Sequence, residues 1–148
     1  MRIKVPVSDN VTNKLVRLKG AFKGIFREAM DWAENDFQEE IKTRKWDWPN
    51  DTFRANGKRV GAPRDIVDLG GLMRSQKREN IGDNKTIFTW TGADPDGSEE
   101  EYALEVHEGY TDRDTGERRL ARPFTEHAIE ELPSIVKQLL MKEAKANG

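Results

Sequence analysis

The chain has 148 residues, a length typical of one domain, and carries 25 basic and 27 acidic residues. Its net charge of −2 at pH 7 argues against a dedicated nucleic-acid-binding protein, whose domain would usually have an isoelectric point above about 9. The lack of cysteine excludes disulfides, thiolate metal sites and cysteine nucleophiles, and is typical of a protein made in a reducing cytoplasm.

The N-terminal part predicts a short strand followed by a long helix. Residues 3–7 alternate apolar and other side chains, and Pro6 would confine such a strand to a sheet edge. From Val11 to Ile41 the apolar residues are three and four apart, the spacing of one helical face. This helix would be about 45 Å long at about 1.5 Å per residue, which is long for a small domain.

Residues 42–65 break the helical period and predict an extended loop or arm. The segment combines glycine, proline and tryptophan with many basic residues. Trp46 and Trp48 would point the same way on an extended segment and could anchor a protein interface. Equally, they could fold back onto the core of their own domain, and the sequence leaves both readings open.

The middle of the chain predicts short elements. A turn of helix is expected over Gly70 to Arg74, a strand around residues 77–78, and a clearer strand at residues 86–91. Residues 102–107 fit either a strand or a short helix, and the choice is left open. Residues 110–120 are expected to form a polar loop.

The C-terminal part predicts a second long helix. It is expected to begin near Pro123, because proline is favourable at the first helical position. Pro133 lies inside the apolar pattern and should kink or split the helix. Residues 142–148 are expected to be a frayed tail.

No residue pattern predicts catalysis or a bound metal. His107 and His127 have carboxylates nearby, but no nucleophile stands at a recognisable spacing, so we expect no enzyme and no cofactor. The acidic residues at 94–101 lack the ligand spacing of a calcium loop, and a solvated turn at 94–97 is the better reading. No apolar run approaches the roughly 20 residues of a membrane span, and residues 1–7 are too short and charged for a signal peptide.

Charge is segregated along the chain. Residues 42–64 are rich in lysine and arginine. The charged residues of segment 94–117 are acidic, with Arg113 as the exception, and three arginines follow between residues 118 and 122. One interpretation is that these segments are solvated loops. A second is that the basic arm and the acidic region meet between neighbouring subunits and set their register. A third is that the basic arm contacts DNA phosphates. The candidate subunit-interface residues are Arg44, Trp46, Trp48, Arg54, Lys58, Arg59, Asp94, Asp96, Glu99, Glu100, Arg118, Arg119 and Arg122.

Three segments carry motif-like residues in a fixed order. The first comprises Ala62-Pro63 and residues 68–75, the second is residues 102–109, and the third is Ala121-Arg122-Pro123-Phe124 leading to Ala128. They are similar to the stretches "aPxxTGxLxxS", "YAxxvExG" and "aRPFlxxA" of the head–tail joining and tail-completion family of long-tailed bacteriophages. Leu69 replaces the family's usual threonine, and His107 interrupts the usual "vE".

The resemblance implies an α+β fold, with a small antiparallel sheet packed against the N-terminal helix and against a C-terminal helix kinked near Pro133. It also implies a structural protein of the virion neck, present in the host cytoplasm before assembly. Several copies, commonly six, would form a ring around the DNA channel. The ring would contact the head connector or a stopper protein on one side, and the tail tube or a tail terminator on the other. Within the third motif we expect Phe124 to lie in the core and Arg122 to face outward or brace the loop, for example against Glu108.

Overall fold

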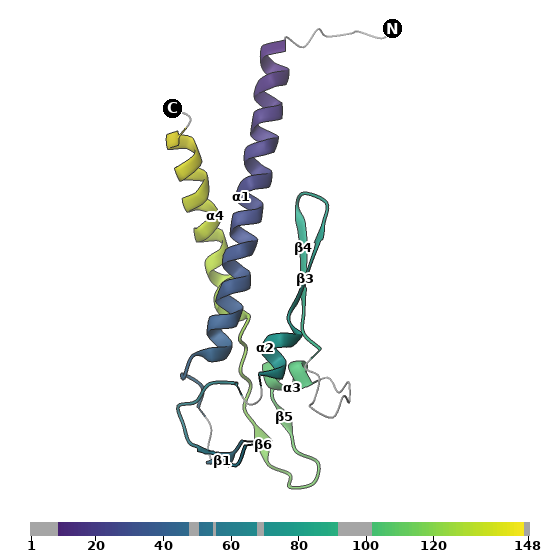
Figure 1. The fold of residues 1–148 in the computed structure, drawn as a ribbon, viewed down its shortest axis with the longest axis vertical. Coiled ribbons are helices and arrows are strands. Elements are labelled where there is room, and N and C mark those ends of the chain that lie inside the picture. The colour runs from purple at the N-terminus through teal and green to yellow at the C-terminus, as the bar shows by residue number, and fades with distance from the viewer. Residues whose placement is uncertain (1–8, 48–50, 55, 68–69, 92–101, 147–148) are drawn as a thin grey trace.

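The computed structural model describes residues 9–47, 51–54, 56–67, 70–91 and 102–146. These residues form a mixed α+β structure, as expected, with a tall helical stalk above a base of short elements (Figure 1). The helices are α1 (Asp9–Lys42), α2 (Gly71–Ser75), α3 (Tyr102–Glu108) and α4 (Glu126–Ala146). The strands are β1 (Thr52–Phe53), β2 (Arg59–Val60), β3 (Lys77–Ile81), β4 (Lys85–Thr89), β5 (Tyr110–Thr111) and β6 (Arg118–Arg119).

The stalk consists of α1 and α4, which pack against each other and run in opposite directions (Figure 1). Ala33, Phe37 and Ala128 are buried together at this contact, where the alanines let the two backbones approach closely. α1 has 34 residues, so the predicted long helix is confirmed and spans about 50 Å at about 1.5 Å per residue. Its N-terminal end extends past both α4 and the β3–β4 hairpin (Figure 1).

The strands form three separate two-stranded antiparallel pairs, β1–β2, β3–β4 and β5–β6, where a single small sheet was expected. The β3–β4 hairpin lies along α1, and three salt bridges attach it there. Arg78 binds both Asp31 and Glu34, and Lys23 Nζ lies 2.6 Å from Asp83 Oδ1 at the hairpin tip.

The base encloses a second core, in which segments from most of the chain meet. The end of α1, the loop before α2, α2 itself, α3 and the segment before α4 each contribute buried residues. The packing of Trp90 and Trp46 against the cluster completes it. The buried members are Ile41, Ile66, Leu72, Ala103, Val106 and Phe124.

Two loop regions differ from the sequence predictions. Residues 42–65 do not project as an extended arm: Trp46 forms a β-bridge with Arg64, and β1 and β2 pair within the segment. The expected polar loop at residues 110–120 instead contains the β5–β6 hairpin. In its turn, Asp112 Oδ1 accepts hydrogen bonds from the backbone N–H groups of Asp114 and Thr115, which closes the loop locally.

Three sequence predictions about helices can be compared with α3 and α4. Residues 102–108, left open between strand and helix, form α3. The last helix begins at Glu126, three residues after the expected Pro123, which lies in the turn before it. Pro133 does not split α4, which runs as one helix to Ala146 and includes residues 142–146 of the expected frayed tail. Residues 3–7 and the turn at 94–97 lie outside the described residues.

Candidate functional site

Three of the predicted interface residues of segment 42–65, namely Trp46, Arg54 and Arg59, are engaged within that segment and the base. Arg54 pairs with Asp65, and both side chains are largely buried. Arg59 Nη2 lies 2.6 Å from Asp51 Oδ2. Arg44 and Lys58 are exposed. The positive charge of the segment is therefore partly balanced by its own carboxylates.

Trp46 does not project from the domain. Trp46 is half-buried against the base core, and its indole N–H donates a hydrogen bond to the Glu40 carbonyl at 3.1 Å. Trp46 therefore takes the second reading offered by the sequence, in which it folds back onto its own domain. Trp48, Asp94, Asp96, Glu99 and Glu100 lie outside the described residues.

The three arginines near residue 120 have different surroundings. Arg118 is exposed, whereas Arg119 pairs with Glu117 at 3.2 Å within the β5–β6 hairpin. Arg122 is only 7% exposed, so the expectation that it faces outward is wrong. Its backbone N–H donates to the Val106 carbonyl at 3.0 Å, which draws the chain inward just before Phe124. Phe124, at 2% exposure, lies in the core as expected.

The two histidines occupy separate places with separate partners. His107 Nε2 lies 2.8 Å from Thr125 Oγ1, and the imidazole packs edge-on against Phe124. His127 Nδ1 lies 2.8 Å from Asp36 Oδ1 and connects α4 to α1. Within the described part of the chain no group of three or more metal-binding side chains is found.

An open apolar groove runs between α4 and the β3–β4 hairpin, with α1 as its floor. It has a volume of about 330 Å³. Ile129 on its α4 side is 64% exposed, although it is a large aliphatic side chain. The groove is lined by Met30, Ala33, Phe37, Thr86, Phe88, Trp90, Thr125, Ala128, Ile129 and Leu132.

The apolar face of α1 continues from this groove toward the N-terminal end of the helix. Leu18, Phe22, Phe26 and Met30 are four residues apart and share one side of the helix. Met30 lines the groove, whereas Leu18 and Phe22 are 66% and 54% exposed. A continuous apolar stripe therefore leaves the groove and runs out along the end of the stalk.

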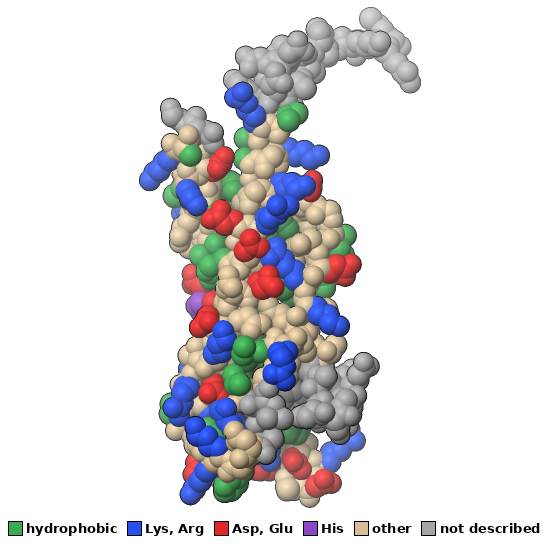
Figure 2. All heavy atoms as spheres, viewed as in Figure 1, with side chains coloured by type: hydrophobic (Ala, Val, Ile, Leu, Met, Phe, Trp, Pro, Cys, Tyr) green, Lys and Arg blue, Asp and Glu red, His purple; other side chains and the backbone are tan. Residues whose placement is uncertain are grey.

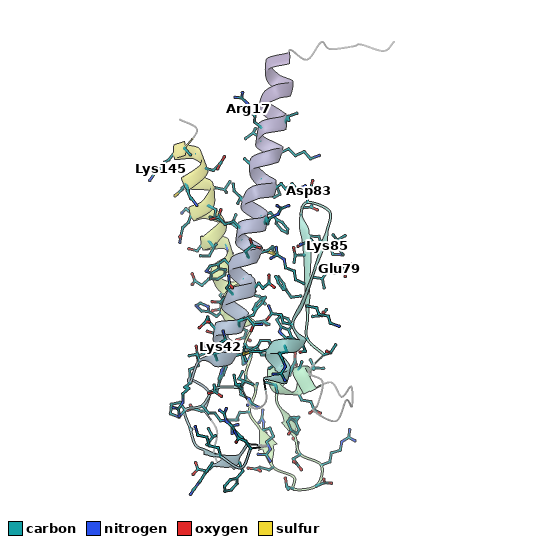
Figure 3. The ribbon with its side chains drawn as sticks, in the orientation of Figure 1. Arg17, Lys42, Glu79, Asp83, Lys85 and Lys145 are labelled. Carbon is teal, nitrogen blue, oxygen red and sulfur yellow. The ribbon has the colours of Figure 1, made fainter. Side chains whose placement is uncertain are left out.

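The charges of α1 are divided between its two halves. Residues 11–27 contain five basic residues and no acidic one, whereas residues 28–40 contain six acidic residues and no basic one. Figure 2 shows basic side chains gathered over the upper stalk, where Figure 3 places Arg17 near the helix end. A count of charge signs along the helix would have revealed this division, which our sequence reasoning missed.

The acidic side chains in residues 28–40 of α1 all have partners within the molecule, whereas most of the described basic ones in residues 11–27 do not. Each of the six acidic side chains lies within ion-pair distance of a basic or histidine side chain. In the basic half, Lys23 pairs with Asp83. Arg17, Lys19 and Arg27 form no ion pair with any side chain that the structure describes.

The basic side chains of this half affect the pKa of Asp83 at the hairpin tip. The Lys23 ammonium lowers the pKa of Asp83 below its ordinary value, and Lys19 and Arg27 act in the same direction. The hairpin tip, where Figure 3 places Asp83, therefore lies in a region of uncompensated positive charge.

Comparison of the chain with protein-family models, curated proteins and solved structures gave no match. Among the described residues no helix is long and apolar enough to cross a bilayer. The function is therefore inferred from the sequence and structure of this chain.

Proposed function

We propose that this chain is a structural protein of the neck of a long-tailed bacteriophage. Several copies would form a ring that completes the tail end and joins it to the head connector around the DNA channel. The proposal starts from the three motif-like segments, and one structural observation supports it most strongly.

That observation is the convergence of the three segments in the base. The first supplies Leu72, the second supplies Ala103 and Val106, and the third supplies Phe124, all to one buried cluster. Segments that are separated by tens of residues thus share one packing role, which is what fold-specifying motifs do. Gly109 of the second motif has φ +76°, and a Cβ atom there would lie 2.6 Å from the Arg119 carbonyl oxygen.

The shape and surface of the molecule also favour an assembly role. The stalk, about 50 Å long, carries an exposed apolar stripe and an open apolar groove, and contiguous exposed apolar surface of this kind marks protein interaction sites. His107 and His127 lie in separate places and each bonds to its own partner, Thr125 and Asp36 respectively.

Purified virions provide the test. Mass spectrometry of particles of the phage that encodes the chain should detect the protein in a fixed, small copy number per particle. The genes beside it should encode portal, capsid and tail-tube proteins. Absence of the protein from purified particles would overturn the proposal.

A further inference from the structure

One surface of the stalk has the chemistry of an amphipathic helix that lacks a partner. On the distal part of α1, residues 16–27, Leu18 and Phe22 provide exposed apolar side chains. Arg17 and Lys19 flank Leu18 on either side, with no ion pair to any described side chain. We call this surface the distal helix.

A second surface has the complementary chemistry. The groove between α4 and the β3–β4 hairpin is apolar, and Ile129 at its α4 side is 64% exposed. Glu126 stands one helical turn before Ile129, and Glu130 follows directly after it. Both carboxylates are exposed and form no ion pair with the side chains that the structure describes.

We propose that the distal helix of one copy of this chain lies in the groove of a second copy. Leu18 and Phe22 would cover Ile129 and Met30, in the way that an amphipathic helix fills an apolar groove. Arg17 and Lys19 would lie beside Glu126 and Glu130 of α4 and set the register of the contact. This inference rests on the self-association that the proposed function requires, and it identifies the surfaces involved.

The chemistry of both surfaces favours a second copy over a nucleic acid. A phosphate backbone would neutralise the basic side chains but would leave Leu18, Phe22 and the groove exposed to water. A second copy covers the apolar side chains and pairs the charges at once. Because the two surfaces are different, the contact is heterologous, the kind that closes into rings.

The absence of cysteine from the sequence makes a direct test possible. Two single-cysteine variants, Phe22→Cys and Ile129→Cys, are mixed, one of them carrying an affinity tag, and oxidised mildly. Their cross-link can only join two copies. The control partner for Phe22→Cys is Leu104→Cys, whose native side chain is 53% exposed on α3, away from the groove. We expect Phe22→Cys to cross-link to Ile129→Cys several-fold faster than to Leu104→Cys.

Charge reversal provides the second arm of the test. Arg17→Glu and Lys19→Glu together should abolish the excess cross-linking, as should Glu126→Lys and Glu130→Lys together. Placing the first set on the Phe22→Cys copy and the second on the Ile129→Cys copy should restore it. Circular dichroism on each variant verifies that the helices are retained.

Equal rates for the two cysteine pairs would overturn the inference. So would loss of duplex DNA binding in the basic-to-acidic variant without any change in cross-linking, since this would make nucleic acid the occupant. Rings seen by electron microscopy without the cross-link would refute this contact but not the neck function. A specific cross-link, observed for a protein that is absent from purified virions, would support this contact and refute the neck function.

Discussion

At the scale of single residues, the base is held by side chains that are buried where separate segments meet. Phe124 is the clearest case, because its ring meets the rings of Trp90 and His107 edge-on at centroid distances of 5.3 Å. Gly109 is the backbone counterpart, since its positive φ and the nearby Arg119 carbonyl leave no room for a side chain.

Phe124→Ala should destabilise the protein by about 3–5 kcal/mol, because it removes a large aromatic side chain from a closed core. Urea unfolding followed by circular dichroism measures the change. Phe53→Ala is the matched control: Phe53 is 73% exposed, so its loss should change stability by no more than about 0.5 kcal/mol. Similar effects of the two substitutions would contradict the assignment of Phe124 to the core.

Gly109→Ala should destabilise more than Gly116→Ala. Both glycines have positive φ, so each alanine incurs a penalty of about 1–2 kcal/mol. Only at residue 109 would the added Cβ also strike backbone atoms, whereas none lies within 4 Å of that position at residue 116. The urea concentrations at the unfolding midpoints of the two variants measure this difference. Equal midpoints would contradict the close backbone contact described for Gly109 of the second motif.

At the scale of elements, the β3–β4 hairpin is held against α1 by both aromatic packing and charge. The Phe88 ring of β4 meets the Phe37 ring of α1 edge-on at a centroid distance of 5.1 Å. Arg78 near its base pairs with Asp31 and Glu34, and Asp83 at its tip pairs with Lys23. The hairpin forms one wall of the open groove, so its attachment determines the shape of that groove.

The Asp83 carboxyl should titrate below the ordinary aspartate value of about 3.9, because Lys23 stabilises its charged form. A lowered folded-state pKa means that the contact is present above the unfolded pKa and is lost as pH falls through the folded one. An NMR titration of the carboxyl carbon measures it. Lys23→Met should raise the pKa, and Lys77→Met, at the other end of β3, should leave it unchanged. An identical titration in all three proteins would contradict the contact.

The sequence predicted elements that depend on long or strong local patterns. The three-and-four spacing from Val11 to Ile41 defined α1, and alternation with β-branched residues defined β4. In residues 102–108, Ala103 and Val106 are buried on one side of a helix, but seven residues are too few for periodicity to decide.

The remaining features depend on contacts that no local pattern specifies. Segment 42–65 folds back because Arg54 meets Asp65 and Trp46 reaches the Glu40 carbonyl. Burial of Arg122 runs against the usual exposure of arginine. The groove between α4 and the β3–β4 hairpin needs three elements in place, so the candidate site could be inferred only from the structure.

At the scale of the whole molecule, the base contains the residues that specify the fold, and the stalk carries the surfaces that we propose to contact other copies. The basic segment 42–64, considered as a DNA-binding arm, fits this division less well, because Arg54 and Arg59 are paired with the carboxylates of Asp65 and Asp51.

The triple variant Arg44→Ala, Lys58→Ala and Arg59→Ala should therefore bind duplex DNA no differently from the native protein. Fluorescence anisotropy between 50 and 200 mM salt measures this, since phosphate contacts weaken steeply over that range. Salt-sensitive binding that disappears in the triple variant would instead support the DNA-contacting alternative.

The central claim is that copies of this chain form part of the phage neck. Electron microscopy of purified particles, with a gold-labelled antibody against the protein, tests it most directly. We predict label at the junction between head and tail and nowhere else on the particle. Unlabelled particles, or label on the capsid faces or the distal tail, would contradict the account.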